Sequence, residues 1–388
     1  MQTRRIRPVF RLAFLVFFVA SGVFGLSWGI AASPFVFGNS LLGGILPAAA
    51  GWLGAAVLVV CIARRRWFCR WGCPVGLLLG RVASLGSSRR RLFKIPLGRW
   101  LALASLGGAA SGIPLLLWLD PVALFTGGFG AAGERSRIVA VAALGILAGI
   151  TLLSLLQREV WCHSLCPAGG LQDLCAAWRQ ALHAQASAQE PRPGRRRVLA
   201  ALGGAAVFGT GVLLGRIARG RPKLAPPLRP PGTVDESRLA GMCSRCGNCV
   251  RACPAGIIRP ETQMTLNLLT PIVEFAQDYC RENCVRCTEV CPTGALRRLT
   301  FADKRAAKIG LARVDLDLCW LTFDRECNIC GRACPYEAIT FEWNEETYTR
   351  VPRIDPRRCN GCGACEVACP ASGEDDAGNS AKAVIVTT

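Results

Sequence analysis

The stretch Cys243-Ser244-Arg245-Cys246-Gly247-Asn248-Cys249-Val250-Arg251-Ala252-Cys253-Pro254 decides the fold of the C-terminal part of the chain. It reads Cys-x2-Cys-x2-Cys-x3-Cys-Pro, which is the spacing of bacterial ferredoxins that bind [4Fe–4S] clusters. Three further runs end in Cys-Pro. Their cysteines are Cys280, Cys284, Cys287 and Cys291 in the second run, Cys319, Cys327, Cys330 and Cys334 in the third, and Cys359, Cys362, Cys365 and Cys369 in the fourth.

These sixteen thiols, out of 22 cysteines, match four ligands for each of four [4Fe–4S] clusters. Zinc sites use two separated Cys pairs rather than runs of four, and disulfide frameworks of small secreted domains do not repeat this spacing. No Cys-x-x-Cys-His is present, so attached c-type haem is not expected. The sequence therefore predicts an α+β tandem ferredoxin-like domain at 241–372 that transfers electrons one at a time.

The partnership of the four runs is a separate question. Each run lends its last Cys to the cluster of a partner run, so four runs make two modules. Sequential pairing joins the first run to the second and the third to the fourth, whereas nested pairing joins the first to the fourth and the second to the third. The first and fourth runs share the standard spacing and the other two are distorted, which favours nested pairing. A seven-residue gap sets Cys319 apart from the other ligands.

The N-terminal part is predicted to be a membrane bundle of four helical spans. Leu12 to Ala63 contains no charged residue over 52 positions, enough for two spans that meet near Ser33-Pro34. Trp100–Leu119 and Ile138–Gln157 are two further uncharged stretches of 20 residues each. Val198–Gly215 is a fifth, signal-like stretch of 18 residues.

The charge distribution indicates how the bundle is oriented. The net charge is +20, but the arginines gather beside the apolar stretches, so we interpret them as topology signals and expect no nucleic-acid partner. Basic residues are dense before the first span and between the second and third, and sparse in the other two connections. The positive-inside rule then places the N-terminus in the cytoplasm.

Composition divides the chain into six predicted parts. They are a four-span membrane domain at 1–178, a linker at 179–197, a fifth span or internal twin-arginine-type signal at 198–215, a Pro-rich linker at 216–240, the polyferredoxin domain at 241–372 and a mobile tail at 373–388. Either interpretation of 198–215 puts the clusters in the periplasm. If this stretch only packs on the bundle, the clusters stay in the cytoplasm.

A second cysteine motif, Cys-x3-Cys-Pro, occurs twice in the membrane part. Cys69 and Cys73 follow the second span, and Cys162 and Cys166 follow the fourth. Thiols four residues apart share a helix face, so the two pairs together offer four ligands for a metal or cluster, or a reversible dithiol. Ordinary buried cysteine is the alternative. Trp67, Trp71 and Trp161 either line a quinone site or anchor the interface, His163 is either a proton or metal group or structural, and Asp120 either caps a helix or carries a proton.

Four spans with these motifs resemble the NapH-like membrane ferredoxin-type subunit that supplies electrons to periplasmic nitrate reductase, and Leu119-Asp120-Pro121-Val122 is similar to that family. The rest resembles the NapG-like soluble partner and its methylamine-utilisation counterpart, MauM-like, from the Arg pair near 195 through Leu228-Arg229-Pro230-Pro231-Gly232 to the four runs. The chain therefore looks like a natural fusion of the two. It lacks the cytoplasmic two-cluster tail of the membrane subunit, because no cysteine lies between Cys175 and Cys243.

The resemblance implies a multi-pass protein of the inner membrane that oxidises quinol and relays electrons to a periplasmic reductase or cytochrome. The resemblance implies an electron-transfer subunit that acts as a quinol dehydrogenase component. Its expected partners are the lipid membrane and the quinone pool. Two alternatives stay open. One is an accessory protein that matures or reductively activates a partner metalloenzyme, and the other is electron flow from a periplasmic dehydrogenase into quinone.

Overall fold

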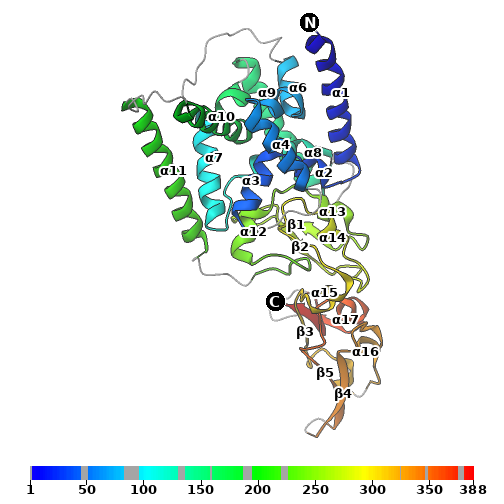
Figure 1. Ribbon diagram of the computed structural model, residues 1–388. Coiled ribbons are helices and arrows are strands. Elements are labelled where there is room, and N and C mark those ends of the chain that lie inside the picture. Colours follow the sequence, from blue (N-terminus) through cyan, green and yellow to red (C-terminus); the bar gives the residue numbers. More distant parts are fainter. Residues whose placement is uncertain are drawn as a thin grey trace.

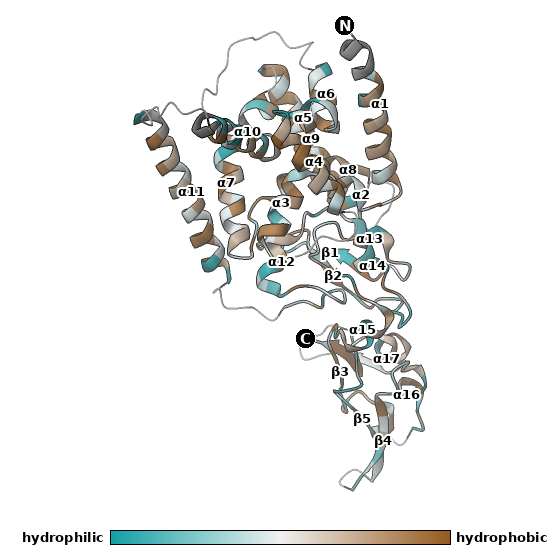
Figure 2. Cartoon of the chain, viewed as in Figure 1, coloured by the Kyte–Doolittle hydropathy of each residue, from teal (hydrophilic) through white to brown (hydrophobic). Residues whose placement is uncertain are grey.

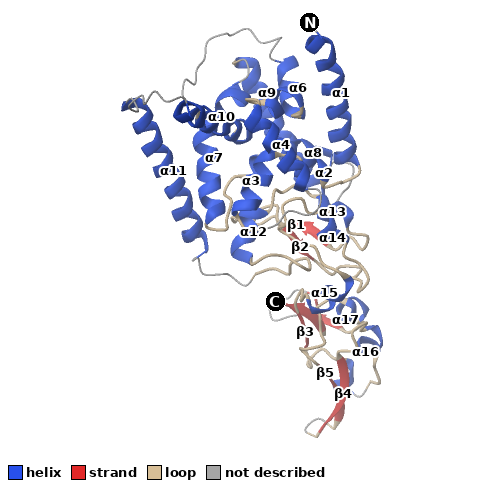
Figure 3. Ribbon diagram, viewed as in Figure 1, coloured by secondary structure: helices blue, strands red, loops and turns tan. Residues whose placement is uncertain are grey.

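The computed structural model describes residues 2–44, 51–82, 96–129, 136–157, 160–186, 195–219, 226–323, 325–345, 348–374 and 380–388. A helical region and a smaller region of short strands and helices lie one above the other (Figures 1 and 3). The N-terminus and the start of α11 (Arg195–Arg219) lie at the upper end of the helical region. The cysteine runs all lie beyond its lower end.

The helical region is built from segments of unequal length. They are α1 (Gln2–Val23), α2 (Trp28–Ala31), α3 (Pro34–Leu42), α4 (Gly51–Ala63), α5 (Trp67–Trp71), α6 (Pro74–Val82), α7 (Leu97–Ala110), η1 (Leu117–Leu119), α8 (Pro121–Gly128), α9 (Arg137–Leu156), η4 (Trp161–Leu165), α10 (Pro167–Ala186) and α11. Apolar residues colour most of α1, α4, α7, α9 and α11 (Figure 2).

Two described helices are long and apolar enough to cross a membrane, Arg137–Leu156 and Val198–Arg219. The first covers the predicted stretch Ile138–Gln157 up to Leu156, and the second contains Val198–Gly215. The other apolar stretches are interrupted in the structure. Pro8–Val23 and Gly51–Ala63 are shorter apolar helices, separated by α2, α3 and a segment outside the described residues.

The stretch Trp100–Leu119 does not form one helix, contrary to the sequence prediction. α7 ends at Ala110, and Gly112 then adopts a left-handed φ of +85°. Pro114 follows, and a proline cannot continue a helix because it lacks the N–H and its ring clashes with the preceding turn. The predicted linker at 179–197 is also largely helical, because α10 continues to Ala186 and α11 begins at Arg195.

α7 and α11 pack closely along a seam of small residues. Gly107 lies against the backbone of Phe208, and Gly211 lies against the backbone of Ala104, so neither position has room for a Cβ atom. Gly215 approaches the Ser111 side chain in the same way. Small residues let two helix backbones approach closely enough to pack by van der Waals contact, as in pairs of membrane helices.

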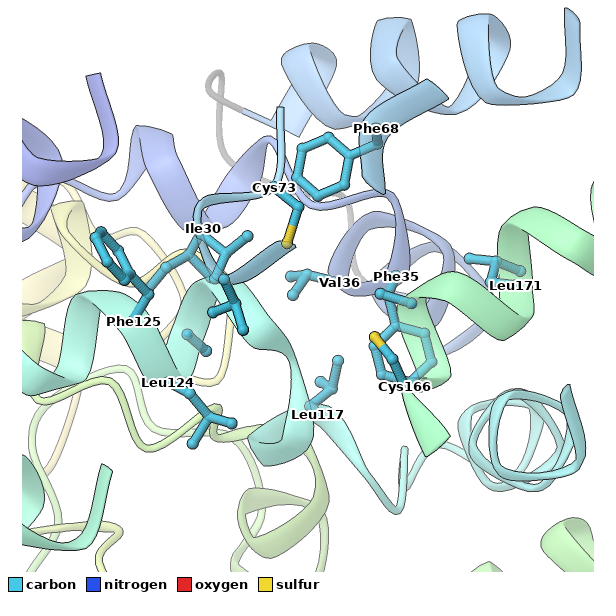
Figure 4. Close-up of a cluster of buried hydrophobic side chains, with 14 of the residues drawn as sticks. Ile30, Phe35, Val36, Phe68, Cys73, Leu117, Leu124, Phe125, Cys166 and Leu171 are labelled. Carbon is cyan, nitrogen blue, oxygen red and sulfur yellow. The ribbon is translucent and has the colours of Figure 1, made fainter. Parts of the chain in front are cut away.

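The interior of the helical region is a single apolar cluster that includes two of the motif cysteines. Figure 4 shows Cys73 and Cys166 among the buried side chains of several helices. Phe35, Val36 and Phe68 in this cluster are almost completely buried. The Cys-x3-Cys-Pro motifs therefore lie inside the helical region rather than on its surface.

The C-terminal region consists of short elements around the cysteine runs. They are α12 (Glu236–Met242), α13 (Asn248–Ala252), β1 (Ile258–Pro260), β2 (Pro271–Val273), α14 (Arg286–Glu289), α15 (Phe301–Ala306), β3 (Leu311–Val314), η5 (Trp320–Phe323), α16 (Ile329–Ala333), β4 (Ile339–Asn344), β5 (Thr349–Ile354), α17 (Ala364–Ala368), β6 (Ser372–Glu374), β7 (Ser380–Lys382) and β8 (Val384–Thr387).

These elements repeat one plan twice. An antiparallel hairpin separates the two runs of each half, β1–β2 in the first and β4–β5 in the second. The chain before and after each pair of runs is also joined, by the bridge between Thr233 and Leu296 in the first half and by the β3–β8 ladder in the second. Each half is therefore a closed module made of two consecutive runs.

The tail at 373–388, which the sequence predicts to be mobile, contains a paired strand. Residues 384–387 form β8, which pairs antiparallel with β3, and Val384 is buried. The alternation in Val384-Ile385-Val386 places two branched side chains on the core face, and β-branched residues fit a half-buried strand. This alternation is present in the sequence, but the polar residues before it obscure the strand.

The first module packs against the lower end of the helical region. The Arg238 guanidinium donates hydrogen bonds to the carbonyl oxygens of Gly43 (2.6 Å) and Gly112 (3.2 Å). The Ser40 hydroxyl donates to the Thr293 carbonyl at 3.4 Å. Gly247, inside the first cysteine run, approaches Val139 of α9. These contacts bring the first run directly onto the helices.

Candidate functional site

The sixteen cysteines of the four runs gather into four groups of four. Site I contains Cys243, Cys246, Cys249 and Cys291, site II contains Cys253, Cys280, Cys284 and Cys287, site III contains Cys334, Cys359, Cys362 and Cys365, and site IV contains Cys319, Cys327, Cys330 and Cys369. Three cysteines of each group come from one run and the fourth is the Cys before Pro of the neighbouring run.

The grouping decides how the runs pair. Cys291 of the second run joins site I, and Cys253 of the first run joins site II. The third and fourth runs exchange Cys334 and Cys369 in the same way. Pairing is therefore sequential, and the nested arrangement that the spacing favoured is wrong. Each module joins one run of standard spacing to one distorted run, because the intervening hairpin returns the chain to the run just before it.

The standard runs share a local conformation. Gly247 and Gly363 occupy the same position in the first and fourth runs, and both have left-handed backbones with φ of +71° and +83°. Glycine adopts such angles without steric penalty, and here it lets the chain turn tightly between two ligands. Equivalent backbone hydrogen bonds reach the lent cysteines, from Leu296 N–H to Cys291 Sγ (3.3 Å) and from Ala338 N–H to Cys334 Sγ (3.4 Å).

The thiols are arranged for a polynuclear cluster rather than for one ion. No three His, Cys, Asp or Glu side chains in the described ranges converge tightly enough to hold a single metal ion. The cysteines of sites I, II and III instead each surround a cavity. No disulfide joins any of the 22 cysteines, all of which lie in the described ranges. Four soft thiolates around a cavity fit a [4Fe–4S] cluster.

Burial favours the protonated form of several of these thiols. It raises the pKa of Cys243 to about 12, although Arg245 opposes the rise. Burial also raises the pKa of Cys365 to about 12, and the neighbouring Cys362 adds to the effect. Thiolates are the species that bind iron, so cluster insertion must displace these protons.

The four sites follow one another away from the helical region. Site I touches α9 through Val139, which lines the same cavity as its cysteines. Cys249 of site I lies within electrostatic reach of Cys287 of site II. Site II meets site III across the module boundary, where the Cys280 N–H donates to the Cys362 carbonyl at 2.8 Å. Site IV shares the second module with site III.

A buried lysine that the sequence did not single out contacts site II. The Lys304 side chain is 0% exposed, and its ammonium group donates to Cys280 Sγ at 3.1 Å. It also donates to the carbonyl oxygens of Cys284 (2.7 Å) and Arg281 (3.0 Å). Lys304 lies on α15, outside the four cysteine runs, and only the folding of the chain brings it to site II.

The two Cys-x3-Cys-Pro motifs meet inside the helical region. Cys73 lies within electrostatic reach of Cys69, Cys162 and Cys166, and Gly169 packs between Cys69 and Cys166. The i, i+4 spacing predicted that the two thiols of each motif share one helix face, and this prediction is wrong. In both motifs the second Cys follows the end of a short helix, and its N–H bonds to the carbonyl five residues before it, Phe68 for Cys73 and Trp161 for Cys166.

A polar network surrounds these four thiols. The buried Gln172 amide donates to Cys69 Sγ at 3.0 Å. Asp173 accepts a two-pronged ion pair from Arg66, at 2.6 and 3.0 Å. Arg66 also contacts His163 Nδ1 at 2.8 Å. The four thiols therefore lie beside a fixed polar network that includes His163 and the ion pair between Arg66 and Asp173.

The other residues to which the sequence assigned two alternative roles make capping or packing contacts. Asp120 is fully buried and caps α8, accepting from the Val122 and Ala123 N–H groups and from the Ser33 hydroxyl at 2.5 Å. Trp161 is buried in the core. Trp67 and Trp71 pack edge-on against phenylalanines of α1.

Comparison with known proteins assigns both regions. A 4Fe-4S dicluster domain model matches residues 242–295 and 325–372. A 4Fe-4S binding domain model matches residues 45–95 and 139–182, which contain the Cys-x3-Cys-Pro motifs. No solved structure matches the chain.

Curated relatives match the C-terminal half. The chain is 37% identical over 196 residues to the ferredoxin-type protein NapG of Escherichia coli (strain K12), covering 46% of this chain and 83% of that protein. It is 36% identical over 181 residues to the methylamine utilization ferredoxin-type protein MauM of Methylobacillus flagellatus, covering 45% of this chain and 75% of that protein. The MauM protein of Paracoccus denitrificans is 34% identical, with 77% of its length covered.

Two modules, each made of two runs that exchange their last cysteines around cavities, define a polyferredoxin, a protein that binds multiple [4Fe–4S] clusters and transfers electrons. The relatives narrow this class. The chain belongs to the family of NapG/MauM ferredoxin-type proteins.

Proposed function

We propose that this protein is a membrane-anchored iron–sulfur wire that relays electrons between the quinone pool and a periplasmic redox partner. The observation that carries the proposal is the row of cysteine sites, which begins against the helices at site I and continues outward to site IV. A row of redox centres that starts at a lipid-embedded domain suits transfer between a lipid-soluble carrier and a water-soluble protein.

Sites I to IV each hold one [4Fe–4S] cluster in this proposal, with the sixteen cysteines as ligands. Site IV includes Cys319 despite its unusual gap, because this side chain lies beside Cys327 and Cys369. Iron and sulfide analysis of protein purified without oxygen tests the assignment. About sixteen irons per chain is expected, and about twelve would exclude one of the four sites.

The N-terminal region serves as the electron-entry domain, in the manner of a NapH-like subunit fused to the polyferredoxin. The match of this region to a 4Fe-4S binding domain supports the idea, as does the convergence of Cys69, Cys73, Cys162 and Cys166. If these thiols hold a fifth cluster, iron analysis gives about twenty irons, whereas a metal-free dithiol adds none.

The helical region crosses the inner membrane with its N-terminus inside. The apolar α9 and α11 and the basic residues at the upper end, among them Arg64, Arg65 and Arg66, support this orientation. A C-terminal epitope tag should be accessible to antibody in intact spheroplasts, whereas an N-terminal tag should require permeabilised cells. The reverse pattern would place the clusters in the cytoplasm.

Electron entry from quinol has a direct test. Adding a short-tailed quinol to the oxidised, cluster-loaded protein should bleach the visible absorption of the clusters. Dithionite serves as the control for clusters that can be reduced at all. Bleaching by dithionite but by neither benzoquinols nor naphthoquinols would reject the quinol-to-partner direction.

A further inference from the structure

A large cavity lies where the first module meets the helical region. Its volume is about 700 Å³, and it opens beside the C-terminal half of α11. This volume is within the range of small-molecule binding sites. None of the four Cys-x3-Cys-Pro cysteines lines it.

The cavity has one apolar wall and one polar wall. The helical region supplies Ile113, Leu115, Trp118, Leu214 and Ile217. The first module supplies Glu236, Glu261, Gln263, Thr265 and Asn267. Leu214 and Ile217 are about half exposed, so the apolar wall continues onto the outer face of α11. An amphipathic molecule dissolved in lipid can reach the cavity along this helix.

The polar wall is held rigid by a buried arginine. Arg229 donates to Glu236 at 2.9 Å and to Glu261 at 2.8 Å. Glu236 in turn accepts from the Asn267 amide nitrogen at 2.6 Å, which fixes that side chain. These hydrogen bonds hold the polar wall in place.

The cavity and the site I cavity share a lining residue. Arg245 lines both of them, and it is held by hydrogen bonds to the carbonyl oxygens of Leu268 (2.8 Å) and Leu266 (2.9 Å). Gly241, two residues before the site I ligand Cys243, lines the cavity as well. A molecule in the cavity is therefore next to the first cluster of the row.

We propose that this cavity binds the head group of a lipid-soluble quinol. The ring lies between the apolar wall and the polar wall, and the apolar tail lies along Leu214 and Ile217. This inference rests on the proposed function and assigns its quinol site. Oxidation of the quinol to the quinone releases two electrons and two protons. The electrons leave singly through the adjacent cluster at site I, and the protons leave through the carboxylate-lined polar wall to water.

The test uses two neighbouring positions on α11. Leu214 lines the cavity, whereas Leu213 is similarly exposed and does not. Leu214→Trp should fill the cavity and weaken binding of the fluorescent inhibitor 2-heptyl-4-hydroxyquinoline N-oxide by more than about tenfold, while Leu213→Trp should leave it unchanged. Iron content of each variant verifies that the clusters are intact.

Two outcomes overturn the assignment and are distinct from failure of the proposed function. Equal inhibitor binding by both tryptophan variants and the wild type would show that the molecule binds elsewhere. Equal rates of quinol bleaching in the wild type and Leu214→Trp would overturn the cavity while leaving quinol oxidation in place. If quinols do not bleach the wild type but dithionite does, the proposed function fails, whatever the inhibitor measurements show.

Discussion

Lys304 brings a positive charge into the protein interior at a cluster ligand. A buried ammonium group is unfavourable unless its donors are satisfied, and here two carbonyl oxygens and Cys280 Sγ accept from it. The Asn360 amide holds the end of α15 in place by donating to the carbonyls of Lys304 (3.0 Å) and Ala307 (2.7 Å). The charge is therefore fixed beside site II, where reduction of a cluster would add a negative charge.

Replacing Lys304 by Met should make the site II cluster harder to reduce. Loss of the charge and of the hydrogen bond to sulfur destabilises the reduced form, and we expect a shift of about −59 mV, a tenfold change for one electron. An EPR-monitored redox titration measures it. Lys308→Met, at an exposed position on the same segment, is the matched control, and Lys304→Arg keeps the charge if the Met variant folds poorly. Full iron content with an unshifted potential would contradict the role.

Asp120 tests the capping interpretation at the start of α8. Asp120→Ala removes an N-cap and leaves the Ser33 hydroxyl without its acceptor, so we expect the protein to lose about 1–2 kcal/mol of stability. Asp120→Asn keeps an acceptor oxygen and should retain most of it. Thermal unfolding in detergent compares the variants. Unchanged unfolding in the alanine variant together with altered quinol reduction would indicate a proton role instead.

The sequence identified the cysteine ligands of the clusters but not the other residues that lie beside the sites. The sixteen cysteines stand out because iron–sulfur clusters demand a fixed spacing along the chain. Lys304 and Asn267 have no such pattern, since each acquires its role from a contact between distant segments. Their significance depends on tertiary packing, which local sequence does not encode.

The hairpins β1–β2 and β4–β5 decide which runs become partners. Each hairpin turns the chain back before the next run begins, so the second run of each module lies against the first. The spacing of the cysteines reflects only how each run wraps one corner of a cluster. Similar spacing therefore does not identify partners, which is why the nested prediction failed.

Counting irons in double variants distinguishes the two pairings. Cys243→Ser with Cys291→Ser alters two ligands of site I, so only one cluster should be lost and about twelve irons should remain in the sixteen-cysteine domain. Nested pairing would assign these residues to different clusters and leave about eight. Cys243→Ser with Cys253→Ser is the control, because these residues belong to sites I and II, and it should leave about eight.

At the scale of the helices, uncharged length predicted α9 and α11 and misjudged α7. Hydropathy averages over a window and does not register that Gly112 and Pro114 end a helix. The strand β8 escaped notice for the opposite reason, since four residues are too few for an alternating pattern to stand out. Its pairing with β3 becomes evident only once the module closes.

The whole molecule places its cysteine sites in a row rather than in a compact group. Site I lies on the helices, sites I and II share one module, and sites II and III meet where Cys280 contacts Cys362. An electron that enters at the helices must pass each site in turn. The two modules also pack against each other where Gly363 meets Phe275.

Interrupting the row at site III should isolate site IV. Cys362→Ser removes a ligand of site III, so quinol should then reduce sites I and II but not site IV, whereas dithionite should reduce all remaining clusters. Rapid-freeze EPR follows each signal. Cys369→Ser, which disables site IV alone, should leave sites I to III reducible by quinol. Reduction of site IV by quinol in the Cys362 variant would show that the row is not the route.

The exchange of cysteines between consecutive runs constrains biosynthesis. In the first module, site II cannot be completed before Cys287 has been synthesised and site I cannot be completed before Cys291, and by then the whole of α11 has been made. In the second module, site III needs Cys365 and site IV needs Cys369. With the periplasmic location proposed above, a secretion machine that threads unfolded polypeptide would separate each incomplete cluster from its missing thiols, so the export machinery must accept this domain already assembled.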